Sequence, residues 1–104
     1  MSFGLSDSQF EDITEVLFRP VTQHGAKTWV FGSRARGDHS EFSDLDVLIE
    51  AGDDLKPVVS KISEELENGS FPFKVDIVFA QDLADSYRDS VDAEKVHVEV
   101  DDAP

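Results

Sequence analysis

Residues 31–49 read FGSRARGDHSEFSDLDVLI, and this stretch contains the two features from which the rest of the chain is interpreted. A Gly-Ser pair at 32–33 follows a β-prone run, and an Asp-Leu-Asp triplet at 44–46 opens a second apolar run. Apolar, β-branched runs bounded by Gly and polar residues are typical of strands. The stretch therefore predicts a strand over 28–31, a helical turn over 33–37, a polar loop over 38–43 and a strand over 45–49.

Helical and extended patterns alternate along the rest of the chain. Ser6 and Gln9 form a capping-box pattern ahead of apolar residues at helical spacing, and Pro20 is expected to end or kink that helix. This alternation indicates an α/β or α+β fold with a small sheet, and the length of 104 residues predicts one domain over residues 1–104. The further patterns predict a helix over 55–68, a strand over 75–79, a helix over 82–95 and a strand over 96–100.

The chain is strongly acidic, because 23 Asp and Glu against 9 Lys and Arg give a net charge of −14. This charge argues against an autonomous nucleic-acid-binding protein and against binding to an anionic membrane. It suits a basic protein partner, or a carboxylate cluster that binds a metal ion. The sequence contains no Cys, which excludes disulfides and a cysteine nucleophile. Without a membrane-spanning run or a signal-peptide pattern, we expect a cytoplasmic protein.

Three carboxylates interrupt or border the apolar strands: Asp44, Asp46 and Asp76. Asp44 and Asp46 share one face of their strand because side chains at i and i+2 point the same way. Asp76 joins them if strand 75–79 lies beside strand 45–49. Clustered carboxylates repel one another, and a hard divalent cation such as Mg²⁺ relieves that repulsion. We therefore predict that these three residues form a catalytic metal site.

The Gly-Ser turn is suited to hold phosphate groups. Gly32 permits close approach of the backbone, and the N–H groups that follow, the Ser33 hydroxyl and either Arg34 or Arg36 can donate to a triphosphate. The spacing is not that of a P-loop. A phosphate-binding turn beside an acidic pair is the layout of metal-assisted phosphoryl or nucleotidyl transfer. In that chemistry one metal orients the triphosphate, and a second activates the attacking oxygen.

The string from Gly32 to Ile49 closely resembles the signature of minimal nucleotidyltransferases (MNT), a branch of the DNA polymerase β-like nucleotidyltransferase superfamily. The resemblance extends over residues 29–79. It implies a small mixed β-sheet flanked by helices. It also implies that Asp44, Asp46 and Asp76 bind Mg²⁺, and that Gly32 and Ser33 bind ATP with the help of Arg34 or Arg36.

MNT proteins are commonly encoded beside a HEPN-domain ribonuclease toxin. The resemblance therefore implies an antitoxin that transfers AMP from ATP to a tyrosine of that toxin. The chain departs from many relatives at residues 92–95, where it reads DAEK in place of a basic residue followed by Glu-Gly.

Two alternatives remain open beside this protein adenylyltransferase. One is a non-catalytic antitoxin that uses its negative charge to occlude a basic partner. The other is a small-molecule nucleotidyltransferase whose pocket is completed by a partner subunit. A template-directed polymerase is disfavoured, because a chain of this length has no room for further domains and carries no basic track. A small domain without its own substrate wall is expected to act as a homo-oligomer or hetero-oligomer.

Overall fold

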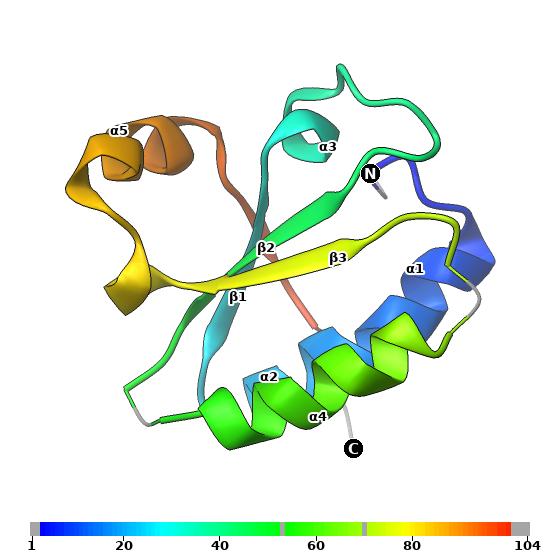
Figure 1. Cartoon of the computed structure of the whole chain (residues 1–104), viewed down its shortest axis with the longest axis horizontal. Coiled ribbons are helices and arrows are strands. Elements are labelled where there is room, and N and C mark those ends of the chain that lie inside the picture. The colour runs from blue at the N-terminus through cyan, green and yellow to red at the C-terminus, as the bar shows by residue number, and fades with distance from the viewer. Residues whose placement is uncertain (1–2, 53, 70, 101–104) are drawn as a thin grey trace.

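The computed structural model describes residues 3–52, 54–69 and 71–100 and contains a four-stranded sheet (Figure 1). The sheet order is β3-β2-β1-β4, in which β1 is antiparallel to both β2 and β4, while β2 is parallel to β3. The mixed sheet flanked by helices confirms the fold expected from the sequence. The strands are β1 (Lys27–Phe31), β2 (Leu45–Glu50), β3 (Val75–Phe79) and β4 (Val96–Val98).

The helices cover the two faces of the sheet unequally. In Figure 1, α1, α2 and α4 lie together on one side of the sheet, and α5 lies on the other. None of the helices in the described part of the chain is long and apolar enough to cross a membrane. The helices are α1 (Asp7–Ile13), a π-helical turn η1 (Thr14–Phe18), α2 (Arg19–Gln23), α3 (Ser33–Arg36), α4 (Lys56–Glu67), a 3₁₀ turn η2 (Ala80–Asp82) and α5 (Asp85–Glu94).

The first helical segment begins as predicted but runs past its proline. Ser6 Oγ accepts the Gln9 N–H at 3.1 Å, and Gln9 Oε1 accepts the Ser6 N–H at 2.9 Å, so the capping box is formed. Pro20 does not end the helix, which continues through α2 to Gln23. The π-helical turn η1 comes just before it, so the proline falls in the first turn of α2, where a missing N–H is tolerated.

The central strand β2 divides the molecule into a core side and an open side. Leu45, Val47 and Ile49 are fully buried against α1, η1 and α4. Because side chains alternate along a strand, Asp46 projects to the opposite face. That face is covered only in part, since Val91 is the one buried residue of α5. The fold therefore buries one face of β2 and leaves the end of the other face open to solvent.

Candidate functional site

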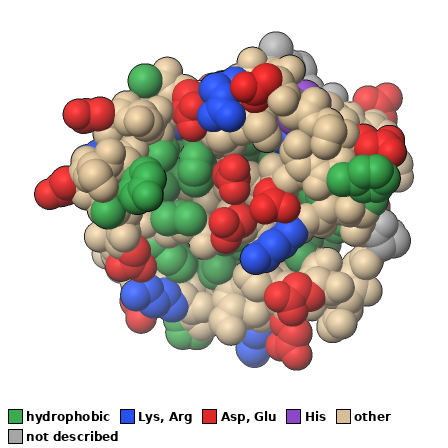
Figure 2. Space-filling model, turned by 45° about the horizontal axis from the view of Figure 1, so that its top comes forward, with side chains coloured by type: hydrophobic (Ala, Val, Ile, Leu, Met, Phe, Trp, Pro, Cys, Tyr) green, Lys and Arg blue, Asp and Glu red, His purple; other side chains and the backbone are tan. Residues whose placement is uncertain are grey.

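Two carboxylates lie side by side on neighbouring strands. Asp46 of β2 is paired with Asp76 of β3 in the parallel register, so their Cα atoms are about 5 Å apart. Asp44 is exposed and lies just before β2, on the same side of the chain as Asp46. Figure 2 shows Asp and Glu side chains gathered in the middle of this face. The structure thus confirms that strand 75–79 lies beside strand 45–49 and places the three predicted carboxylates in one region.

The carboxylate at the centre of this region is electrostatically strained. The pKa of Asp46 is raised from its ordinary 3.8 to about 6, first by burial and then by the charges of Asp76, Asp44 and Glu94, in that order of size. Arg36 acts in the opposite direction but does not compensate. The region therefore carries more negative charge than its own cations neutralise, and a bound cation would relieve this excess.

The described residues contain no group of three or more His, Cys, Asp or Glu side chains already arranged to hold a metal ion. The donor chemistry nevertheless fits a hard divalent cation, because the site offers only carboxylate oxygens. Asp44 and Asp76 are exposed, and Asp46 is partly buried between them and the sheet. Mg²⁺ is commonly held by one or two carboxylates, with waters and substrate phosphates completing its coordination. Asp44, Asp46 and Asp76 are the residues that would hold such an ion.

Gly32 brings the end of β1 against this acidic region. Its backbone adopts φ +76° and ψ −157°, a conformation that residues with a side chain rarely adopt. A Cβ built on Gly32 would collide with Asp46 Oδ2. Glycine is thus required twice at this position, once for the turn and once for the close approach of the Asp46 carboxylate.

Ser33 opens the four-residue helix α3 directly after this glycine. The N–H groups of Ala35 and Arg36 donate back to the Gly32 carbonyl at 3.1 and 3.0 Å, which closes the turn. No residue in the described ranges takes a hydrogen bond from the Ser33 hydroxyl or gives one to it. The hydroxyl and the first backbone N–H groups of the turn are therefore available to a ligand.

The two arginines of the turn have different environments, and Arg34 departs from its predicted role. Arg34 is 2% exposed, and its guanidinium lies 4.5 Å from the centre of the Phe73 ring. Burial lowers the pKa of Arg34. Its Nε, Nη1 and Nη2 donate at 2.9, 3.0 and 3.0 Å to the carbonyls of Ser43, Phe3 and Glu41. Arg34 therefore holds the loop before β2. The sequence had led us to expect either Arg34 or Arg36 at the nucleotide, and all three guanidinium nitrogens of Arg34 already donate to these carbonyls.

Arg36 instead projects to the surface beside the acidic region. Its Nη1 donates to Glu94 Oε2 at 2.9 Å, and its Nε donates to Asp38 Oδ2 at 3.2 Å. The hydrogen bonds to Glu94 and then to Asp38 raise the pKa of Arg36. Of the two predicted arginines, Arg36 is the one placed to meet a phosphate bound at the turn.

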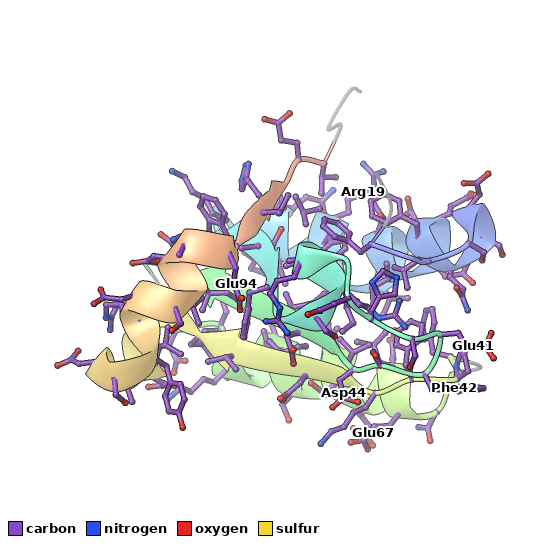
Figure 3. The ribbon with its side chains drawn as sticks, turned by 90° about the horizontal axis from the view of Figure 1, so that it is seen from above. Arg19, Glu41, Phe42, Asp44, Glu67 and Glu94 are labelled. Atoms are coloured by element: carbon purple, nitrogen blue, oxygen red, sulfur yellow. The ribbon has the colours of Figure 1, made fainter. Side chains whose placement is uncertain are left out.

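Glu94 is a site residue that sequence reasoning missed. Figure 3 shows it at the end of α5 nearest α3. Its Oε1 accepts the Gly32 N–H at 3.0 Å, across 62 residues of sequence. The pairing of Val30 with Val96 explains the contact, because the same antiparallel register, continued by two residues, places Glu94 opposite Gly32. In the sequence, residues 92–95 stood out only as a departure from related sequences, and the pairing of β4 with β1 is what places Glu94 at the turn.

Comparison with known proteins identifies this arrangement. The sequence profile of the family described as "Nucleotidyltransferase domain" matches residues 9–98. The chain belongs to this family. The matched range includes the Gly-Ser turn, all three aspartates and Glu94.

A solved structure supports the same assignment. It is described, provisionally, as that of a minimal nucleotidyltransferase, and it shares 31% sequence identity with this nucleotidyltransferase. The match has a TM-score of 0.64 and covers 92% of this chain and 95% of the other. No curated protein matches the chain significantly. The resemblance to minimal nucleotidyltransferases inferred from residues 29–79 is therefore confirmed at the level of family and fold.

Proposed function

We propose that this nucleotidyltransferase uses Mg²⁺ and ATP to transfer AMP to a tyrosine of a HEPN-domain ribonuclease toxin, and that it thereby acts as an antitoxin. One observation carries the catalytic part of the proposal: Asp46 and Asp76 are paired across β2 and β3 directly beside the Gly32-Ser33 turn. The antitoxin role and the toxin partner rest on the resemblance to the MNT branch.

The roles of the chain's own residues follow from their positions. The Ser33 hydroxyl and the N–H groups of its turn bind the triphosphate, and the free N–H groups of Arg36 add a charged donor. Asp44, Asp46 and Asp76 are the residues that would hold the divalent cations, and the sequence leads us to expect two Mg²⁺ ions. When bound, these cations neutralise the triphosphate and activate the attacking hydroxyl.

The reaction forms one bond and breaks one. The acceptor oxygen attacks the α-phosphorus of ATP, the bond to the bridging oxygen of the β-phosphate breaks, and pyrophosphate leaves. In this proposal Asp76 accepts the proton of the attacking hydroxyl, and its exposure on the edge strand β3 supports that role. Positioning by Ser33 and Arg36 holds the α-phosphorus in line with that hydroxyl.

A groove beside Asp76 supports a macromolecular acceptor. Its volume is about 620 Å³, and it runs between α4, the edge of β3 and the loop before β2. Phe42, which is 63% exposed, and Glu67 line it and are labelled in Figure 3. The net charge of −14 favours a basic partner in this position. A polypeptide segment in the groove would bring a side-chain hydroxyl to the carboxylates.

The test is coexpression of the chain with the HEPN protein encoded beside it, followed by mass spectrometry of the toxin. We expect the wild type to restore growth and to leave AMP on a toxin tyrosine. We expect Asp44→Asn with Asp46→Asn to bind the toxin but to leave it unmodified and active. A double variant that modifies the toxin as well as the wild type does would contradict the proposal.

The acidity of the chain favours a second candidate function, which is neutralisation by occlusion. In that case the double variant restores growth without modifying the toxin, since charge complementarity alone would hold the complex. The same experiment therefore separates catalysis from occlusion.

A further inference from the structure

The guanidinium of Arg36 is held from two sides by carboxylates. Asp38, two residues along the chain, accepts from Nε, and Glu94, from the far end of the chain, accepts from Nη1. A guanidinium carries five N–H donors in a rigid plane. Two of these donors are used, and no residue in the part of the chain that the structure describes accepts from Nη2. The group is therefore fixed in orientation but can still donate to a ligand.

Glu94 contacts the phosphate-binding turn through both of its oxygens. While Oε2 pairs with Arg36, Oε1 accepts the Gly32 N–H at 3.0 Å. The Glu94 side chain is 22% exposed, compared with 47% for Arg36, so the pair lies at the margin of the site. Neither contact uses the Ser33 hydroxyl. Glu94 thus fixes the two flanks of the turn and leaves its central donor free.

The end of α5 holds Glu94 in place from behind. The Lys95 N–H donates to the Val91 carbonyl at 2.8 Å and ends the helix. Lys95 Nζ forms ion pairs with Glu50 at 3.3 Å and with Asp92 at 3.0 Å. It also lies over the Trp29 ring, 4.4 Å from the ring centroid. These contacts anchor the segment on the sheet, so the Glu94 carboxylate is presented by a restrained backbone.

We propose that Glu94 is a positioning residue for nucleotidyl transfer: it orients Arg36 and the Gly32 backbone so that Arg36 donates to the phosphates of a bound nucleoside triphosphate. The inference rests on the proposed function for the triphosphate, and it adds a residue that the metal-binding and phosphate-binding sets do not contain. A restrained guanidinium loses less side-chain entropy on binding than a free one does.

The experiment is a double-mutant cycle on nucleotide affinity. The dissociation constant of Mg·ATP is measured by calorimetry for the wild type, Glu94→Ala, Arg36→Ala and the double variant. Glu94→Asp, which keeps both carboxylate oxygens, tests conservative rescue, and Asp89→Asn, an exposed acidic residue of α5, is the charge-matched control. The melting temperature of each variant is recorded to separate affinity from folding.

We expect Glu94→Ala to weaken ATP binding by roughly 3–10-fold, as for the loss of one restrained charged donor. Glu94→Asp keeps a carboxylate oxygen for each of the two donors, so it should recover part of the affinity, and Asp89→Asn should match the wild type. In the Arg36→Ala background, removing Glu94 should change the affinity by less than about 2-fold, because neighbouring residues that act together are non-additive.

Three results would overturn the role of Glu94. One is an equal loss of affinity with and without Arg36, and another is a loss in Glu94→Asp as large as in Glu94→Ala. The third is tighter ATP binding by Glu94→Ala, which would show that the carboxylate competes with phosphate. If the wild type bound no ATP, the proposed function itself would be wrong. The three results above instead contradict only the role of Glu94, because in each of them the wild type still binds ATP.

Discussion

Asp46 and Asp76 are partners in the parallel register of β2 and β3, so two carboxylates occupy adjacent positions on one face of the sheet. Like charges at this spacing resist simultaneous ionisation. Burial, and after it the charge of Asp76, raises the pKa of Asp46 to about 6. The arrangement is unfavourable for the isolated domain and favourable for a site that binds a divalent cation with a triphosphate.

Asp46→Asn is expected to stabilise the isolated domain at neutral pH. The folded protein binds a proton at Asp46 more tightly than the unfolded chain does, so its stability falls as pH rises from 3.8 to about 6. Above that window the ionised Asp46, which faces Asp76, Asp44 and Glu94 with only Arg36 opposing them, costs about 1–2 kcal/mol after solvent screening. Asparagine removes this cost.

Thermal unfolding in EDTA checks this prediction. The variant should melt several degrees above the wild type at pH 7.5, and the difference should shrink toward zero near pH 4, since about 1 kcal/mol corresponds to roughly 4–8 °C at this size. Asp89→Asn serves as the exposed control. A variant that melts below the wild type at pH 7.5 would show that the Asp46 charge stabilises the fold.

Gly32→Ala is expected to abolish transfer as well as to destabilise the domain. The alanine meets both the positive φ and the Asp46 carboxylate, which must move away. Gly25→Ala is the matched control, because Gly25 has φ +86° and a Cβ there would meet nothing within 4 Å. We expect Gly25→Ala to cost about 1–2 kcal/mol of stability with full activity in the folded fraction. Equal activity in the two variants would rule out the close approach at Gly32.

Substituting the two arginines of the turn should have different effects, one on the stability of the fold and the other on ATP binding. Arg34→Met removes a buried guanidinium from three carbonyls, so we expect a loss of about 2–4 kcal/mol in the free energy of unfolding. Arg36→Ala should change the melting temperature little and weaken ATP binding by about 10-fold. Urea unfolding and calorimetry measure the two quantities. If Arg36→Ala unfolded the domain and Arg34→Met left it stable, the structural role would belong to Arg36 and these two predictions would be wrong.

Much of the fold was predictable because the strands carry strong local signals. The β-prone run at 75–79 matches β3 without error, and the capping box at Ser6 marks the start of α1. The expectation that Pro20 could end the helix was wrong, because the proline lies in the first turn of α2, just after the π-helical turn. Local pattern also gave the neighbouring carboxylates Asp44 and Asp46.

The rest of the site depends on tertiary contacts that local pattern does not encode. Arg34 and Arg36 are equivalent in the sequence, and only the packing of the loop before β2 buries one and exposes the other. Glu94 is opposite Gly32 because β4 pairs with β1, a relationship between residues far apart in the chain. The structure brings the motif residues Asp44, Asp46 and Asp76 into one region, whereas Glu94 was found only in the structure.

The most direct measurement is transfer of label from α-labelled ATP to the purified HEPN partner in the presence of Mg²⁺. We predict labelled toxin with the wild type, no labelling in EDTA, and a loss of more than about 100-fold in Asp44→Asn with Asp46→Asn, since even outer-shell partners of metal sites are worth about 10–100-fold. Labelling by the double variant at the wild-type rate would contradict catalysis by the paired carboxylates.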